Sequence, residues 1–150
     1  MTEHTPEFHE ALERVGVIAQ LFDQGVPYDE VQEKAVLQGL SQEQAALAFH
    51  FLCEACGYVF AKELGIHMAD TLILKSDQRE QELRIDDSDD FQAAYYLAYN
   101  LRHGGRNDLF ATLVQPSSIS HTINNAMNSD PNLKLTDLAG AQFSPLVVWF

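Results

Sequence analysis

The sequence predicts a mainly α fold, a compact domain of about five to seven helices around a central apolar helix at 41–64. Apolar residues recur at helical spacing along most of the chain, and glycine or proline follows most periodic segments. Residues 45–60 are apolar on nearly every side, which is typical of a helix that other elements cover all round. The 150 residues, of which 46% are hydrophobic, suit one domain over 1–150.

Two amphipathic helices are expected at the start of the chain. The first covers 6–24, where Pro6 suits a first helical turn and Gly25 with Pro27 ends the pattern. The second covers 28–38 and stops before a glycine. Their inward residues follow helical spacing and are Phe8, Leu12, Val15, Ile18 or Ala19, and Phe22, then Val31, Ala35 and Val36.

The central helix contains both cysteines, Cys53 and Cys56, with His50 upstream. A redox C-x-x-C pair has its first cysteine at a helix N-terminus, whereas Cys53 is about three turns inside this helix. His50 and Cys56 are about 9 Å apart along a helix axis, too far to share one zinc ion. A site on the two cysteines needs further ligands, for which the candidates are His67, His103 and His121. We therefore interpret both thiols as core side chains and expect no metal and no cofactor.

The start of that helix and the segment after it carry local signals. Ser41 and Gln44 have the spacing of a capping box. Residues 71–86 favour a small β-hairpin, in which 71–75 pairs with 82–85, because three apolar residues at 72–74 are consecutive. No glycine or proline interrupts this segment, so a helix is the alternative.

Helices return after the hairpin. Asp89 is expected to cap a helix, with Gln92 at its third position, and two glycines at 104–105 end it. Its inward stripe is Phe91, Ala94 or Tyr95, Ala98, and Leu101 or Arg102.

The last third of the chain predicts two short helices and an apolar ending. Asn107 is expected to cap a helix through residue 114, and Pro116 to begin one that runs to about residue 128. The ending, 143–150, is apolar, β-branched and aromatic. It is expected to form a final strand or a docked tail that completes the core.

The net charge of −13 is concentrated in two acidic blocks. Residues 1–33 carry −7 and residues 77–90 carry −5. Such a field repels nucleic acid and anionic membranes and attracts a basic protein. We therefore expect no direct nucleic-acid or membrane partner. A solvated surface without a partner is the plainer reading of both blocks.

Three further motifs lack the context that their chemistry needs. The acids at 86–90 have Phe91 and Leu97 where a calcium loop requires glycine and glutamate. The segment 102–108 closes a helix, whereas a phosphate loop opens one. Ser120 and His121 are neighbours on a helix and point apart. No catalytic constellation is visible, so the sequence favours a binding protein over an enzyme.

Our first functional hypothesis is a small acidic protein that binds and masks a basic protein, such as a toxin or nuclease, as an immunity-type inhibitor or nucleic-acid mimic. The acidic surface would speed association and an aromatic anchor would hold the complex. The expected partner-binding residues are Asp77, Glu80, Glu82, Asp86, Asp87, Asp89, Asp90 and Trp149. Two cysteines without a disulfide framework, and an acidic N-terminus without an apolar stretch, indicate the cytoplasm.

Two alternatives come from other classes of protein. One is an enzyme or small-molecule-binding domain with a pocket lined by His50, Cys53, Tyr95, Tyr99 and His103. The other is a homo-oligomer assembled through the C-terminal segment. Burial of Trp149 within the protomer would count against the homo-oligomer.

Overall fold

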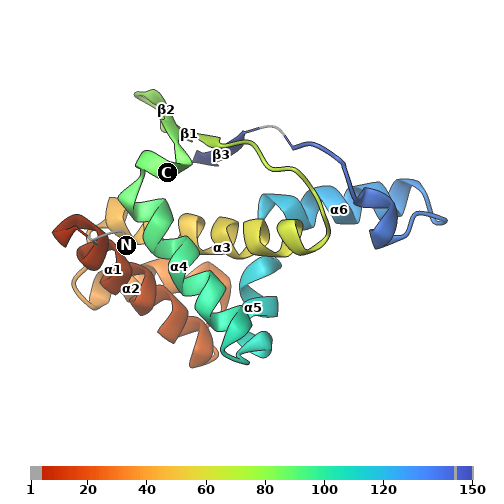
Figure 1. Ribbon diagram of the computed structural model, residues 1–150. Helices are drawn as coiled ribbons and strands as arrows, with labels where there is room; N and C mark the ends of the chain where they lie inside the picture. The colour runs from red at the N-terminus through yellow and green to blue at the C-terminus, as the bar shows by residue number, and fades with distance from the viewer. Residues whose placement is uncertain (1–4, 144, 150) are drawn as a thin grey trace.

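The computed structural model describes residues 5–143 and 145–149 and confirms the mainly α class (Figure 1). Glu3 of the first acidic block and Phe150 of the apolar ending lie outside this description. The helices are α1 (Pro6–Asp23), α2 (Tyr28–Leu37), α3 (Gln42–Glu63), α4 (Asp89–His103), α5 (Asn107–Val114) and α6 (Ser118–Ser129), with 3₁₀ turns η1 (Ile85–Asp87) and η2 (Leu135–Leu138). The strands are β1 (Thr71–Lys75), β2 (Glu80–Arg84) and β3 (Leu146–Trp149).

Helix α3 is the centre of the fold, as its apolar composition predicts. It contacts α1, α2, α4, α5, α6 and β3, and both of its cysteines are buried (Figure 1). The expected capping box forms, since Ser41 and Gln44 each accept a backbone hydrogen bond from the other at 3.0 Å. By length and composition this helix is apolar enough to cross a membrane, but 72% of its most apolar window is buried inside the protein. That burial identifies it as a core helix.

The predicted hairpin forms, and the C-terminal segment joins it as a strand. The sheet has the order β2-β1-β3, with β1 antiparallel to β2 and parallel to β3. Strand β2 begins at Glu80, two residues earlier than expected, because the Ser76 N–H bonds the Arg79 carbonyl at 2.9 Å and tightens the turn. Figure 1 shows this sheet lying across α3.

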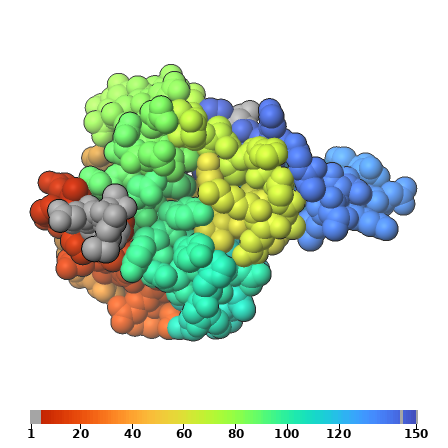
Figure 2. Space-filling view, viewed as in Figure 1, coloured from red at the N-terminus to blue at the C-terminus, as the bar shows by residue number. Residues whose placement is uncertain are grey.

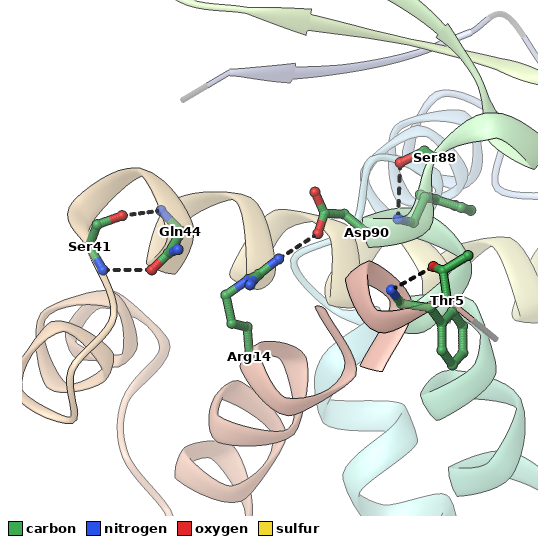
Figure 3. A network of polar contacts seen from close by, with 8 residues as sticks. Thr5, Arg14, Ser41, Gln44, Ser88 and Asp90 are labelled. Carbon is green, nitrogen blue, oxygen red and sulfur yellow. Dashed lines mark hydrogen bonds and ion pairs between the residues drawn. The ribbon is translucent and has the colours of Figure 1, made fainter. Parts of the chain in front are cut away.

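The structure corrects the expected start of α4. Ser88, not Asp89, is the N-cap, and its hydroxyl accepts the Phe91 N–H at 3.1 Å (Figure 3). The Gln92 amide donates to the Ile85 carbonyl at 2.9 Å instead of completing a capping box. The cause is turn η1, which leads directly into Ser88, so that Asp89 is already the first residue of the helix.

Two other expectations for the second half of the chain were also wrong in detail. Asn107 does not cap α5 but accepts a hydrogen bond from Arg102 at 2.7 Å. Of the two alternatives for the last inward position of α4, Leu101 packs against the core, whereas Arg102 bonds Glu63 at 2.8 Å. Helix α6 begins at Ser118, two residues after the expected start at 116, and is capped by Ser117. A contact with Arg102 takes up the Asn107 side chain, and a serine next to Pro116 supplies the cap of α6.

Candidate partner-binding surface

The seven acids of the second block lie on the hairpin, on η1 and on the first turn of α4. Asp77 is in the hairpin turn, and Glu80 and Glu82 are exposed on β2. These segments form the upper surface of the molecule in Figure 2. The first acidic block lies on α1 and α2, on a different part of the molecule (Figure 1).

Two of these seven carboxylates are bound within the chain. Glu80 forms a salt bridge with Lys75 at 3.0 Å, and Asp90 forms one with Arg14 at 3.0 Å (Figure 3). The other five take part in no salt bridge among residues 5–143 and 145–149; they are Asp77, Glu82, Asp86, Asp87 and Asp89. The structure therefore leaves five carboxylates of this surface available to an outside cation.

Trp149 lies in the same sheet as two of these acids, Glu80 and Glu82, although it is far from them in sequence. Its Cα partner on β1 is Lys75, whose Cα partner on β2 is Glu80. The Lys75 ammonium is 5.3 Å from the centroid of the Trp149 ring and bonds Glu80 on its other side. One cross-strand row thus joins the tryptophan to the acidic strand.

The outer face of the sheet is partly apolar. Leu146 and Val148 are buried, but Val147 is 39% exposed and Trp149 is 59% exposed. The expectation that the whole ending completes the core is therefore wrong for these two residues, because strand side chains alternate between faces. We name the outer residues Ile73, Lys75, Val147 and Trp149 the Trp149 face; Glu80 and Glu82 border it on β2.

The five residues of the alternative pocket do not line one cavity. Cys53 is buried in the core, and burial, the nearby Cys56 and Glu54 raise the pKa of its thiol well above its ordinary value. Tyr95 packs edge-on against Tyr58 and accepts a hydrogen bond from Lys62 at 3.4 Å. The rings of Tyr99 and His103 contact each other at a tilt of 42°, with centroids 4.1 Å apart, at the exposed end of α4.

His50 instead lines a groove of about 720 Å³ between the α1–α2 turn, α3 and the α5–α6 connection. His121 of α6 lies on the same groove, with Phe22, Tyr28, Phe49 and Pro116. Burial lowers the pKa of His50, so its imidazole is neutral at pH 7. The groove is mostly apolar with two imidazoles on its walls.

Glu54, one turn after His50, is a buried carboxylate that the sequence analysis missed. Its Oε1 accepts hydrogen bonds from the N–H of Ser118 at 2.9 Å and from its hydroxyl at 2.8 Å. Its buried Oε2 has no hydrogen-bond partner among the described residues. Burial raises the pKa of this carboxyl, while the Ser118 bonds and the His121 charge oppose the shift. The available signal was its position as the single acid in the apolar run 45–61.

Within the described part of the chain, no group of three or more His, Cys, Asp and Glu side chains is placed to hold a metal ion. His67, His103 and His121 are thus not assembled around Cys53 and Cys56 there. No family model, no curated protein and no solved structure matches this chain.

Proposed function

We propose that this chain is a protein-binding module that captures a basic protein partner through the Trp149 face and the surrounding acids. The observation that carries the proposal is the cross-strand row in which exposed Trp149 contacts Lys75 of β1, which in turn bonds Glu80 of acidic β2. An aromatic side chain within a charged border is the usual anatomy of a binding hot spot. The masking of a basic toxin or nuclease is one form of this function.

Charge and anchor have separate roles in this proposal. The five carboxylates without an internal salt bridge speed the encounter with a cationic surface, and salt screens that effect. Trp149 supplies apolar area that holds the complex once it has formed. Loss of the acids therefore lowers the association rate, and loss of Trp149 raises the dissociation rate.

The test is affinity capture from a lysate of the source cell at low and high salt, comparing wild type with two charge-reversed variants. The first carries Glu82→Lys on β2 and Asp86→Lys and Asp87→Lys on η1, which follows β2. The matched control carries Asp29→Lys, Glu30→Lys and Glu33→Lys on exposed positions of α2, so both variants have the same net charge.

The proposal expects one basic protein that is captured by wild type and the α2 variant, is lost with the first variant, and is weakened by salt. Trp149→Ala should weaken its binding about 30-fold, the effect of a hot spot worth about 2 kcal/mol. If both charge variants lose capture of this protein equally, binding depends on the net charge of the chain and not on the acids of β2 and η1. Failure to capture a basic protein in either salt condition would reject the proposal.

A second candidate function is small-molecule binding in the groove between His50 and His121. The specific observation is the size of this apolar groove together with its two imidazoles. A screen of small aromatic compounds by NMR, with His121→Ala as the variant, tests it. Ligands that shift His50 and His121 resonances and lose affinity in the variant would support this candidate; an empty screen would reject it.

A further inference from the structure

A groove of about 500 Å³ lies between α5, α6 and the C-terminal end of α3. It is distinct from the groove of His50 and His121, with which it shares no described lining residue. Helix α6 packs against α3 and projects from the body of the molecule (Figures 1 and 2). The volume is in the range of small-molecule sites, roughly 300–1,000 Å³. The larger apolar side chains of its walls are Phe60, Phe110, Val114, Ile123, Met127 and Leu135.

The groove lies where two apolar clusters meet. Phe110 and Val114 belong to the main core, whereas Ile123 belongs to a smaller cluster that includes residues of α6. Phe60 packs against both clusters. Met127, beside the smaller cluster, has an unbranched and flexible side chain that adapts to the shape of a neighbour. An apolar ligand in the groove would therefore extend both clusters.

Arg102 supplies a cation at the rim of this groove. Its Nε and Nη2 donate to the two carboxylate oxygens of Glu63 at 2.8 and 3.0 Å, and its Nη1 donates to Oδ1 of Asn107 at 2.7 Å. The guanidinium carbon is 5.6 Å from the centroid of the Phe110 ring. These contacts fix the guanidinium against the groove wall, so little conformational entropy is lost when a ligand binds it.

The rim offers hydrogen-bond donors. A guanidinium has five N–H groups, and the bonds to Glu63 and Asn107 leave two of them without a hydrogen-bond partner among the described residues. Because Oδ1 of Asn107 accepts from Arg102, the amide NH₂ of Asn107 is the part left to bind a ligand. No Asp or Glu of the described residues lines this groove, although the chain has 22 acids. The complementary ligand group is therefore an acceptor.

We propose that this groove binds a carboxylic acid with a hydrocarbon chain, which lies between α5 and α6 while the carboxylate binds Arg102 and Asn107. A guanidinium forms stronger hydrogen bonds with a carboxylate than with a neutral acceptor. Glu63 balances the charge of Arg102, so recognition depends on the two spare N–H groups. The Arg102 side chain is 36% exposed, so the bound carboxylate keeps part of its hydration. The site is separate from the Trp149 face, and the inference does not depend on the basic partner.

NMR titration of the purified full chain with decanoate, kept below the concentration at which it forms micelles, tests the proposal. Decanamide has the same chain with a neutral head, and decylamine has a positive head. Decanoate should shift the methyl resonances of Ile123 and Met127 and leave the imidazole resonances of His50 and His121 unchanged. It should bind about fivefold more tightly than decanamide, and decylamine should bind there more weakly than either.

Variants of the rim and of the wall separate the two parts of the site. Glu63→Gln removes the carboxylate that shares Arg102 with the ligand, so it should strengthen decanoate binding about fivefold and leave decanamide binding unchanged. Arg102→Gln should remove the preference for decanoate over decanamide. Ala111→Trp, at an exposed position of α5 on the groove, should block both ligands. The matched control, Thr112→Trp, lines the groove of His50 instead and should bind decanoate like wild type.

Three results would overturn the proposal. They are decanoate that binds no more tightly than decanamide, a Glu63→Gln variant that binds decanoate no better than wild type, and binding that persists in Ala111→Trp. The absence of Ile123 and Met127 shifts would do the same. Circular dichroism verifies that each variant is folded. The samples contain no other protein, so the result is separate from that of the capture experiment.

Discussion

The carboxylate of Glu54 on α3 accepts two hydrogen bonds from Ser118, the first residue of α6 and 64 positions further along the chain. Glu54 thereby caps the N-terminus of α6 from a distant part of the chain. Its carboxylate also interacts favourably with the positive end of the α6 dipole. The contact attaches α6 to the central helix. Its cost is a buried carboxyl whose pKa is raised.

Replacing Glu54 should change how stability depends on pH. Because burial raises its pKa in the folded protein, the folded state binds the proton more tightly than the unfolded state. The contribution of Glu54 to stability is therefore greatest below the ordinary glutamate pKa of about 4.3 and is lost as pH rises through the raised folded-state pKa. In Glu54→Gln this loss should disappear, a difference of about 1.4 kcal/mol for each pH unit between the two pKa values.

Urea unfolding over a pH series measures this effect, with Glu10→Gln, at an exposed acid of α1, as the control. The control should keep the wild-type profile. An unchanged profile in Glu54→Gln would show that another group sets the pH dependence.

The close approach of α3 and α6 at Gly57 should make a methyl group costly there. A Cβ on Gly57 would lie 2.6 Å from Cγ2 of Ile119 and 2.7 Å from Oγ of Ser117. Gly57→Ala should therefore lose about 1–3 kcal/mol of unfolding free energy, as overpacked cores do. Gly16 is also helical but has nothing within 4 Å of its Cβ position, so Gly16→Ala should gain about 0.5–1 kcal/mol. Chemical denaturation compares the two, and a stabilised Gly57→Ala would contradict this packing.

The N-cap of α4 can be tested by two neighbouring substitutions. Ser88→Ala removes the oxygen that accepts the Phe91 N–H and should cost about 1 kcal/mol. Asp89→Ala should cost less unfolding free energy, since Asp89 makes no capping hydrogen bond. Its exposed carboxylate interacts only with the positive end of the helix dipole. Thermal unfolding gives both values. A larger loss of unfolding free energy in Asp89→Ala than in Ser88→Ala would show that Asp89 is the N-cap of α4, as the sequence predicted.

Trp149 should contribute little to the stability of the protomer. With 59% of its surface exposed, Trp149→Ala should change the unfolding free energy by about 1 kcal/mol, the scale of its exposed cation–π contact with Lys75. Phe91→Ala, at a fully buried ring, should cost about 3–5 kcal/mol. Unfolding followed by circular dichroism at low protein concentration measures both, since the variant lacks the single tryptophan. A large loss for Trp149→Ala would assign that residue to the core and weaken its role as an anchor.

Several elements of the fold were predictable because their causes are local. The capping box at Ser41 and Gln44 formed as expected, since it depends on two side chains three residues apart. The apolar run of α3 predicted a central helix, and consecutive apolar residues at 72–74 predicted a strand. The burial of both cysteines also followed from their apolar neighbours.

The elements of the candidate surface were only partly predictable. Charge patterning indicated the acidic block, but Asp90 proved to be paired with Arg14, 76 positions away. The sequence also pointed to Trp149 without placing it. The parallel pairing of β3 with β1 decides that Trp149 lies in one row with Lys75 and Glu80.

By itself the sequence determined the class of fold, most of the helices and the location of its charge, because helical period, capping and composition act over a few residues. Only the tertiary structure decided which distant residues became neighbours. It placed Ser118 on the buried Glu54 carboxylate, and it left one sheet edge charged and the other apolar. The physical reason is that strand pairing and the burial of a charge depend on contacts between segments far apart in the chain, which no local pattern specifies.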